Sequence, residues 1–125
     1  MRRRSSRFAE VIYLDNEAAV AALREAAAEL LASDANVSRV YLFGSLAEGT
    51  ATPESDADIL VAVRRAGGRF FDRGDAYREY FARADVGVGL EIFVYTEREV
   101  ERMLAAGNDF IAAALRGALT LAERE

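Results

Sequence analysis

Apolar residues recur along this chain in two patterns, one typical of amphipathic helices and one typical of strands. Spacings of three and four residues predict helices over 16–33, 72–84, 97–106 and 108–117. Runs rich in β-branched and aromatic residues predict strands over 37–43, 58–63 and 86–95, with a brief strand over 118–121. Thr96 and Glu99 have the spacing of a capping box, and Asn108 can cap the last helix. Gly107 and Gly117 are placed to end the last two helices.

The link between the first two strands indicates how they pair. Only residues 44–57 join them, with room for one helical turn and no long helix. A parallel crossover needs a dozen or more residues and usually a helix, so we expect antiparallel neighbours. The predicted fold class is α/β (α+β), with a mixed β-sheet and helices packed mainly on one face.

The length of 125 residues and the hydrophobic content of 52% suit one domain with its own core. We assign residues 1–15 to a flexible N-terminal arm and lead-in, and 16–125 to the folded domain. No apolar run reaches the length of a membrane span and no signal-peptide pattern follows the basic start, so we expect a cytoplasmic protein without membrane contact.

Charge is divided unevenly between the arm and the domain. The net charge is -5, and the arm holds Arg2, Arg3, Arg4 and Arg7, so residues 8–125 carry -5 - 4 = -9. Such a body repels nucleic acid, and contact with nucleic acid is expected only through the Arg-rich arm. The alternative for the arm is a solvated tail without a partner.

The absence of two residue types excludes several chemistries. The chain has no Cys and no His, which excludes thiol nucleophiles, Ser-His-Asp catalysis and Cys-bearing metal sites. Any metal must be held by oxygen ligands, which favours a hard cation such as Mg²⁺.

Three carboxylates stand where strand sequence favours other residues. Asp56 and Asp58 open the second strand, and alternation places both on the same side of it. Glu91 interrupts the apolar run VGLEIFVY, where a carboxylate is costly unless it is paired, solvated or metal-bound. Each residue also has an ordinary structural explanation. Asp56 fits a turn cap, Asp58 fits a solvent-facing position on an edge strand, and Glu91 fits a half-exposed strand position. Together they predict a site for a pair of Mg²⁺ ions.

Gly44 and Ser45 follow the first strand directly. Glycine allows close approach of a ligand to the backbone, and the following N–H groups with the Ser hydroxyl can cradle a phosphate. Gly-Ser alone is a common turn dipeptide, and it indicates a phosphate site here only because the carboxylates follow it at this spacing.

The run YLFGSLAEGTATPESDADILV over 41–61 resembles the signature of the DNA polymerase β-type nucleotidyltransferase superfamily, and most of all its minimal nucleotidyltransferases. The pattern G-S-x-x-x-G-x-x-x-x-x-S-D-x-D is matched by Gly44, Ser45, Gly49, Ser55, Asp56 and Asp58. The likeness extends more loosely over most of the chain from residue 16. It implies the nucleotidyltransferase fold and an Mg-dependent transfer of NMP, AMP above all, from ATP or another NTP to an acceptor hydroxyl.

The resemblance also implies a role for each site residue. Asp56, Asp58 and Glu91 would be catalytic and ligate two Mg²⁺ ions, with Glu91 helping to activate the acceptor, and Gly44 and Ser45 would hold the phosphates. The implied partner is a small helical HEPN-type protein, with this chain as the antitoxin half of the pair, in some members by transferring AMP to a tyrosine of the toxin. A short chain with little beyond a catalytic module would leave recognition of the acceptor to a partner or to the substrate itself.

Two departures from the family pattern keep other functions open. The family often has Arg where this chain has Leu46 and Glu48, so positive charge near the phosphates is reduced. Basic residues that could restore it are Arg64, Arg65, Arg69 and Arg73, for which solvent-facing turns are the alternative. A binding module that neutralises a partner sterically is the second hypothesis, and a nucleotide-binding regulatory subunit is the third.

Overall fold

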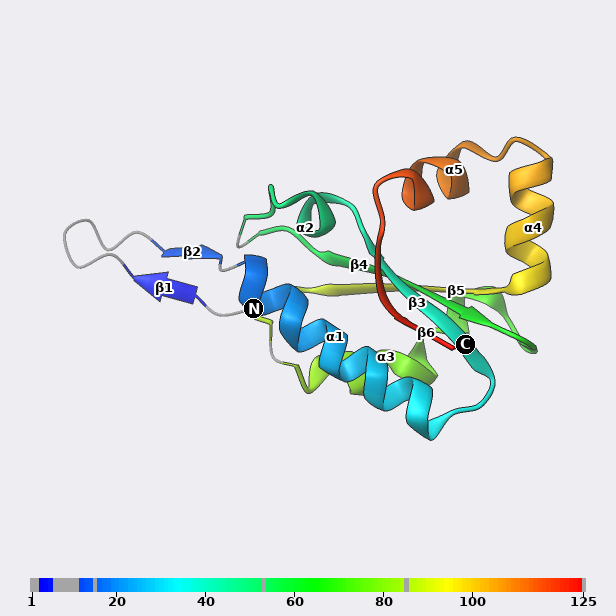
Figure 1. The fold of residues 1–125 in the computed structure, drawn as a ribbon, viewed down its shortest axis with the longest axis horizontal. Helices are drawn as coiled ribbons and strands as arrows, with labels where there is room; N and C mark the ends of the chain where they lie inside the picture. The colour runs from blue at the N-terminus through cyan, green and yellow to red at the C-terminus, as the bar shows by residue number, and fades with distance from the viewer. Residues whose placement is uncertain (1–2, 6–11, 15, 53, 85, 125) are drawn as a thin grey trace.

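The computed structural model describes residues 3–5, 12–14, 16–52, 54–84 and 86–124 of the chain (Figure 1). Two short strands, β1 (Arg3–Ser5) and β2 (Ile12–Leu14), pair antiparallel. The remaining elements, in chain order, are α1 (Asn16–Ser33), β3 (Val37–Phe43), α2 (Ser45–Glu48), β4 (Ala57–Val63), a 3-10 turn (Phe70–Asp72), α3 (Asp75–Ala82), β5 (Leu90–Thr96), α4 (Glu97–Ala105), α5 (Asp109–Arg116) and β6 (Leu119–Glu123).

The described residues form a mixed four-stranded sheet in the order β5-β4-β3-β6. β3 pairs antiparallel with both β4 and β6, whereas β4 and β5 are parallel. The antiparallel pairing of β3 with β4 and the mixed α+β sheet are confirmed. The parallel pair is joined through α3, as a parallel crossover requires.

Helices cover both faces of the sheet, to different extents (Figure 1). α1 and α3 lie against one face, where Leu23, Leu30 and Phe81 are fully buried against the strands. α4 and α5 lie over part of the other face, where Ile111 and Ala114 pack on Phe43 and on β4. The larger core therefore lies beneath α1 and α3, and the second face keeps a stretch of sheet that no helix covers.

The predicted helix signals operate as expected. The Thr96 hydroxyl accepts from the Glu99 backbone N–H at 3.0 Å, and the Glu99 carboxylate accepts from the Thr96 N–H at 2.8 Å. Asn108 caps α5 by accepting from the Ile111 N–H. Gly107 takes a φ of 74° between the two helices, a left-handed conformation that glycine adopts without strain.

The observed elements differ from the expectations mainly in three places. β5 begins at Leu90 rather than at residue 86, because Gly87 at φ 78° leaves the strand conformation. The helix expected over 72–84 is shortened to α3, and the 3-10 turn precedes it. Part of the arm assigned to residues 1–15 is paired as β1 and β2, while Arg2, Arg7 and Pro53 lie outside the described residues.

No helix in the described ranges is both long and apolar enough to cross a membrane.

Candidate functional site

The strand register brings two of the three predicted carboxylates side by side. Asp58 at the start of β4 lies opposite Phe43 of antiparallel β3, and it lies level with Glu91 of parallel β5. Asp58 and Glu91 share the sheet face of Leu60 and Phe93, the face that α4 and α5 only partly cover. The site therefore begins as a row across three strands, with the end of β3, Asp58 and Glu91 in order.

Asp56 joins this row from the loop before β4. Its side chain is exposed, whereas that of Asp58 is half-buried. A Cβ added to Gly89 would collide with Asp56 Oδ1, so the lack of a side chain at Gly89 makes room for this carboxylate. Gly44 does the same for Asp58, because a Cβ there would collide with Asp58 Oδ2. Two glycines thus give both aspartates the space that they occupy.

The pKa of Asp58 shows how the other two carboxylates act on it. The pKa of Asp58 is raised from 3.8 to about 6, first by burial, then by the charge of Glu91 and a hydrogen bond with its side chain, and last by the charge of Asp56. Each of these effects favours the neutral acid. A cation among the three side chains would reverse the two charge effects.

The donor set fits a divalent cation in chemistry, although the side chains do not already surround one point. Among the described residues, no group of three carboxylates is arranged as the ligands of a single ion. Asp58 instead shares a hydrogen bond with the Glu91 side chain. Glu91 is exposed and has three rotatable side-chain bonds, so its carboxylate can turn to a cation without a change in the backbone.

The segment after β3 has the geometry expected of a close-approach loop. Gly44 has φ 79° and ψ -160°, a combination that is essentially restricted to glycine. Ser45 begins the single turn α2, which confirms the predicted helical turn. Leu46 is only 1% exposed and belongs to the main core, so it faces away from the site. Glu48 is exposed.

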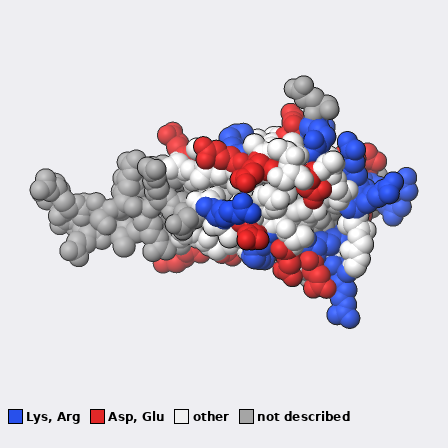
Figure 2. Space-filling model, turned by 90° about the horizontal axis from the view of Figure 1, so that it is seen from below, with Lys and Arg blue, Asp and Glu red and all other residues white. Residues whose placement is uncertain are grey.

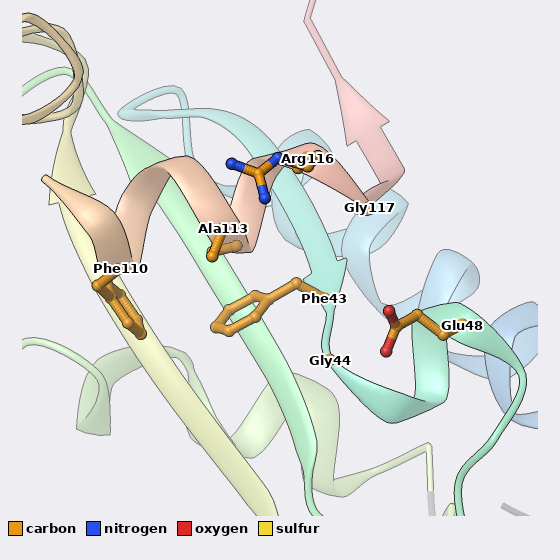
Figure 3. A pocket seen from close by; sticks show the side chains of 8 residues that line it. Phe43, Gly44, Glu48, Phe110, Ala113, Arg116 and Gly117 are labelled. Carbon is orange, nitrogen blue, oxygen red and sulfur yellow. The ribbon is translucent and has the colours of Figure 1, made fainter. Parts of the chain in front are cut away.

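Two pockets flank the carboxylate row and share Phe110. The first, about 480 Å³, is called the Gly44 pocket and is lined by Phe43, Gly44, Glu48, Phe110, Ala113, Ala114, Arg116 and Gly117 (Figure 3). The second, about 420 Å³, is called the Glu91 pocket and is lined by Phe70, Arg78, Leu90, Glu91, Ile92, Phe93, Tyr95 and Phe110. The row thus has one hollow on the β3 side and another on the β5 side.

Aromatic contacts hold the wall between the pockets. The Phe110 ring lies 5.9 Å from the Phe43 ring and 5.2 Å from the Phe93 ring, centroid to centroid. Phe110 is nonetheless 40% exposed, which is high for a large apolar side chain. The sequence places Phe110 on a helix but gives no signal that it divides two pockets, because that depends on how α5 crosses the sheet.

Three of the four basic residues considered from the sequence, Arg64, Arg65 and Arg73, lie or bond away from the carboxylates. Arg64 and Arg65 follow the far end of β4, where their backbone N–H groups bond to Asn36. Six residues of strand separate Arg64 from Asp58, about 20 Å. In Figure 2 basic side chains gather at the right-hand end of the molecule, and β4 finishes toward the right in Figure 1. Arg73 is bound to Glu99 at 2.7 Å. The cation that does line the Gly44 pocket, Arg116, is one that sequence reasoning missed.

Comparison with known proteins shows the family of the chain and a similar fold. Residues 21–116 match the model of the nucleotidyltransferase domain family. The fold is similar to the crystal structure of a candidate nucleotidyltransferase from Sulfolobus solfataricus, with a TM-score of 0.57 and 24% sequence identity over 87% of this chain and 84% of that chain. At that identity the likeness shows the fold alone. No curated protein matches the sequence.

Proposed function

The chain belongs to the nucleotidyltransferase domain family, and on that premise we propose that it is a Mg²⁺-dependent enzyme that transfers a nucleoside monophosphate from an NTP to an acceptor hydroxyl. The observation that carries the proposal is the register that sets Asp58 level with Glu91 and beside Gly44. Carboxylates on two adjacent strands next to a glycine with room for a ligand are what metal-assisted phosphoryl chemistry needs.

Each residue of the row has a separate task in this reaction. Asp56, Asp58 and Glu91 would hold the divalent cations, which supply charge neutralisation and polarise the α-phosphate when bound. Gly44 and Ser45 hold the phosphates of the NTP at the end of β3. The acceptor oxygen forms a bond to the α-phosphorus while the bond to pyrophosphate breaks, and the acceptor proton passes to Glu91 or to water.

The order of the strands fits the in-line geometry of this transfer. The leaving pyrophosphate lies over Gly44 on the β3 side, the α-phosphate lies by Asp58 on β4, and the acceptor approaches from Glu91 on β5. The two pockets lie on these two sides of the row. We assign the Gly44 pocket to the NTP and the Glu91 pocket to the acceptor.

The finer assignments rest on the resemblance of residues 41–61 to minimal nucleotidyltransferases. By that resemblance the donor is ATP, the group transferred is AMP, and the partner is a small helical HEPN-type protein. The chain acts in the cytoplasm as the antitoxin of that pair, and the AMP acceptor is a tyrosine of the toxin.

One experiment separates catalysis from neutralisation by binding alone. The wild type, Asp58→Ala and the control Asp75→Ala, an exposed residue in the first turn of α3, are each co-expressed with the helical partner. Label from [α-³²P]ATP should appear on the partner with wild type and Asp75→Ala, and should disappear with Asp58→Ala. If Asp58→Ala protects cells as well as wild type does, neutralisation is steric and the catalytic role is wrong.

The steric alternative is favoured by one observation at the loop. Glu48 lines the Gly44 pocket and adds a negative charge where the phosphates would lie, and Leu46 is buried where the family often has Arg. Weak nucleotide binding by wild type in calorimetry with Mg²⁺ and α,β-methylene ATP would favour a binding module. Glu91→Gln separates the two functions further, because it should abolish transfer and leave the free energy of unfolding unchanged or higher.

A further inference from the structure

The Gly44 pocket contains two charged side chains of opposite sign, on opposite walls. Arg116 lies on the α5 wall, Glu48 lies on the α2 wall, and Gly44 lies between them at the end of β3 (Figure 3). Neither side chain forms an ion pair or a hydrogen bond with another residue in the described part of the chain. Both charges therefore face the pocket without a protein partner.

The position of Arg116 is fixed by the packing of its helix. Ile111 is fully buried and Ala114 is 7% exposed in the second core cluster, so α5 is fastened to the sheet over Phe43. Phe110 adds the ring contacts with Phe43 and Phe93. Arg116 is the basic residue of the last turn of this anchored helix. The backbone at Arg116 is therefore held in place beside the pocket by a packed helix and not by a loop.

Five other arginines of the described segments form side-chain bonds within the fold. Their partners are the Thr120 carbonyl for Arg24, Glu99 for Arg73, the Leu90 carbonyl for Arg78, Glu29 for Arg83, and the carbonyls of Leu31, Asp34 and Val37 for Arg124. Arg116 differs from these in lining the pocket beside Gly44 while keeping its guanidinium uncommitted. A planar guanidinium with several donors is the group best suited to bind phosphate oxygens.

We propose that Arg116 is the polyphosphate-binding residue of this chain, contacting the β- and γ-phosphates of the NTP in the Gly44 pocket. The inference rests on the proposed function and supplies the positive charge that the Gly44–Glu48 loop lacks. Leu46 is apolar and buried in the core, and Glu48 carries the opposite charge. Arg116 raises the affinity for the triphosphate and Glu48 lowers it.

The test is calorimetric binding of α,β-methylene ATP and of AMP, each with Mg²⁺. We expect Arg116→Gln to weaken binding of the triphosphate analogue roughly tenfold and binding of AMP less than twofold. Arg116→Lys should recover part of the loss, since one charge remains without the fork of donors. Glu48→Gln should tighten binding of the analogue about threefold.

Arg102→Gln is the matched control, because Arg102 is the exposed basic residue in the last turn of α4 and does not line the pocket. It removes the same net charge and should change binding less than twofold. The difference between Arg116→Gln and Arg102→Gln should shrink as NaCl is raised.

Two outcomes overturn the inference. Equal effects of Arg116→Gln and Arg102→Gln would show that only net charge matters. An equal loss for AMP and for the triphosphate analogue would show that Arg116 does not contact the β- and γ-phosphates. If wild type binds neither ligand with Mg²⁺, the proposed function itself fails, a result distinct from both of these.

Discussion

Replacing Asp58 by Asn should stabilise the protein at neutral pH and inactivate it. Asp58 keeps a carboxyl group half-buried beside Glu91 and Asp56, and its pKa is raised from 3.8 to about 6. At about 1.36 kcal/mol per pH unit, that difference sets an upper limit near 3 kcal/mol on the cost of ionising Asp58 in the folded state. Solvent screening of this partly exposed group reduces the expected gain from Asn to about 1 kcal/mol.

The pH dependence of that gain follows from proton linkage. In the unfolded chain Asp58 ionises near 3.8, and in the folded protein it ionises near 6. Between these values the unfolded state binds fewer protons, so the free energy of unfolding falls as pH rises, and the loss is complete above about pH 6. The advantage of Asp58→Asn should therefore be full at pH 8 and absent near pH 3.5.

The assay is thermal unfolding followed by circular dichroism at the two pH values. A gain of about 1 kcal/mol corresponds to roughly 4 °C in Tm for a domain of this size. Asp56→Asn is the control, because Asp56 is exposed and its neutralisation should stabilise less. If Asp58→Asn is no more stable than wild type at pH 8, or equally more stable at both pH values, the electrostatic description of the site is wrong.

Three further predictions concern the loop and the helix cap. Gly44→Ala should lower the free energy of unfolding by about 3 kcal/mol, because φ 79° with ψ -160° excludes a side chain and the new Cβ would collide with Asp58. Gly49→Ala, at φ 77° in open space, should lower it by about 1 kcal/mol. Thermal unfolding measures both. Leu46→Arg should lower the free energy of unfolding in urea by about 3 kcal/mol or more, because it buries a charge in the core. Glu48 is exposed, so Glu48→Arg should stay within about 0.5 kcal/mol of the wild-type stability. Glu48→Arg should also bind ATP more tightly than wild type. Thr96→Ala should cost about 1 kcal/mol, and a loss below about 0.3 kcal/mol would mean that the cap of α4 adds little stability.

Local patterns in the sequence were sufficient for most of the elements, and they nominated the candidate site residues, whose roles stay predictions. α1, β3, α2 and the two helix caps depend on residues within a few positions of one another, so periodicity and capping signals predict them. Alternation along one strand was expected to put Asp56 and Asp58 on one side of it, but β4 begins at Ala57, so Asp56 lies in the loop before the strand. The boundary of β5 was less predictable, since a glycine with positive φ shortens it.

The sequence by itself determined which residues have the chemistry for this site, and the tertiary structure decided which of them meet. Asp58 and Glu91 are 33 positions apart, and only the parallel register of β4 with β5 sets them level. Arg116 is 72 positions from Gly44, and only the packing of α5 across β3 brings both to one pocket. Strand register and helix placement are set by burial of the whole core, a sum over distant contacts that no local pattern contains.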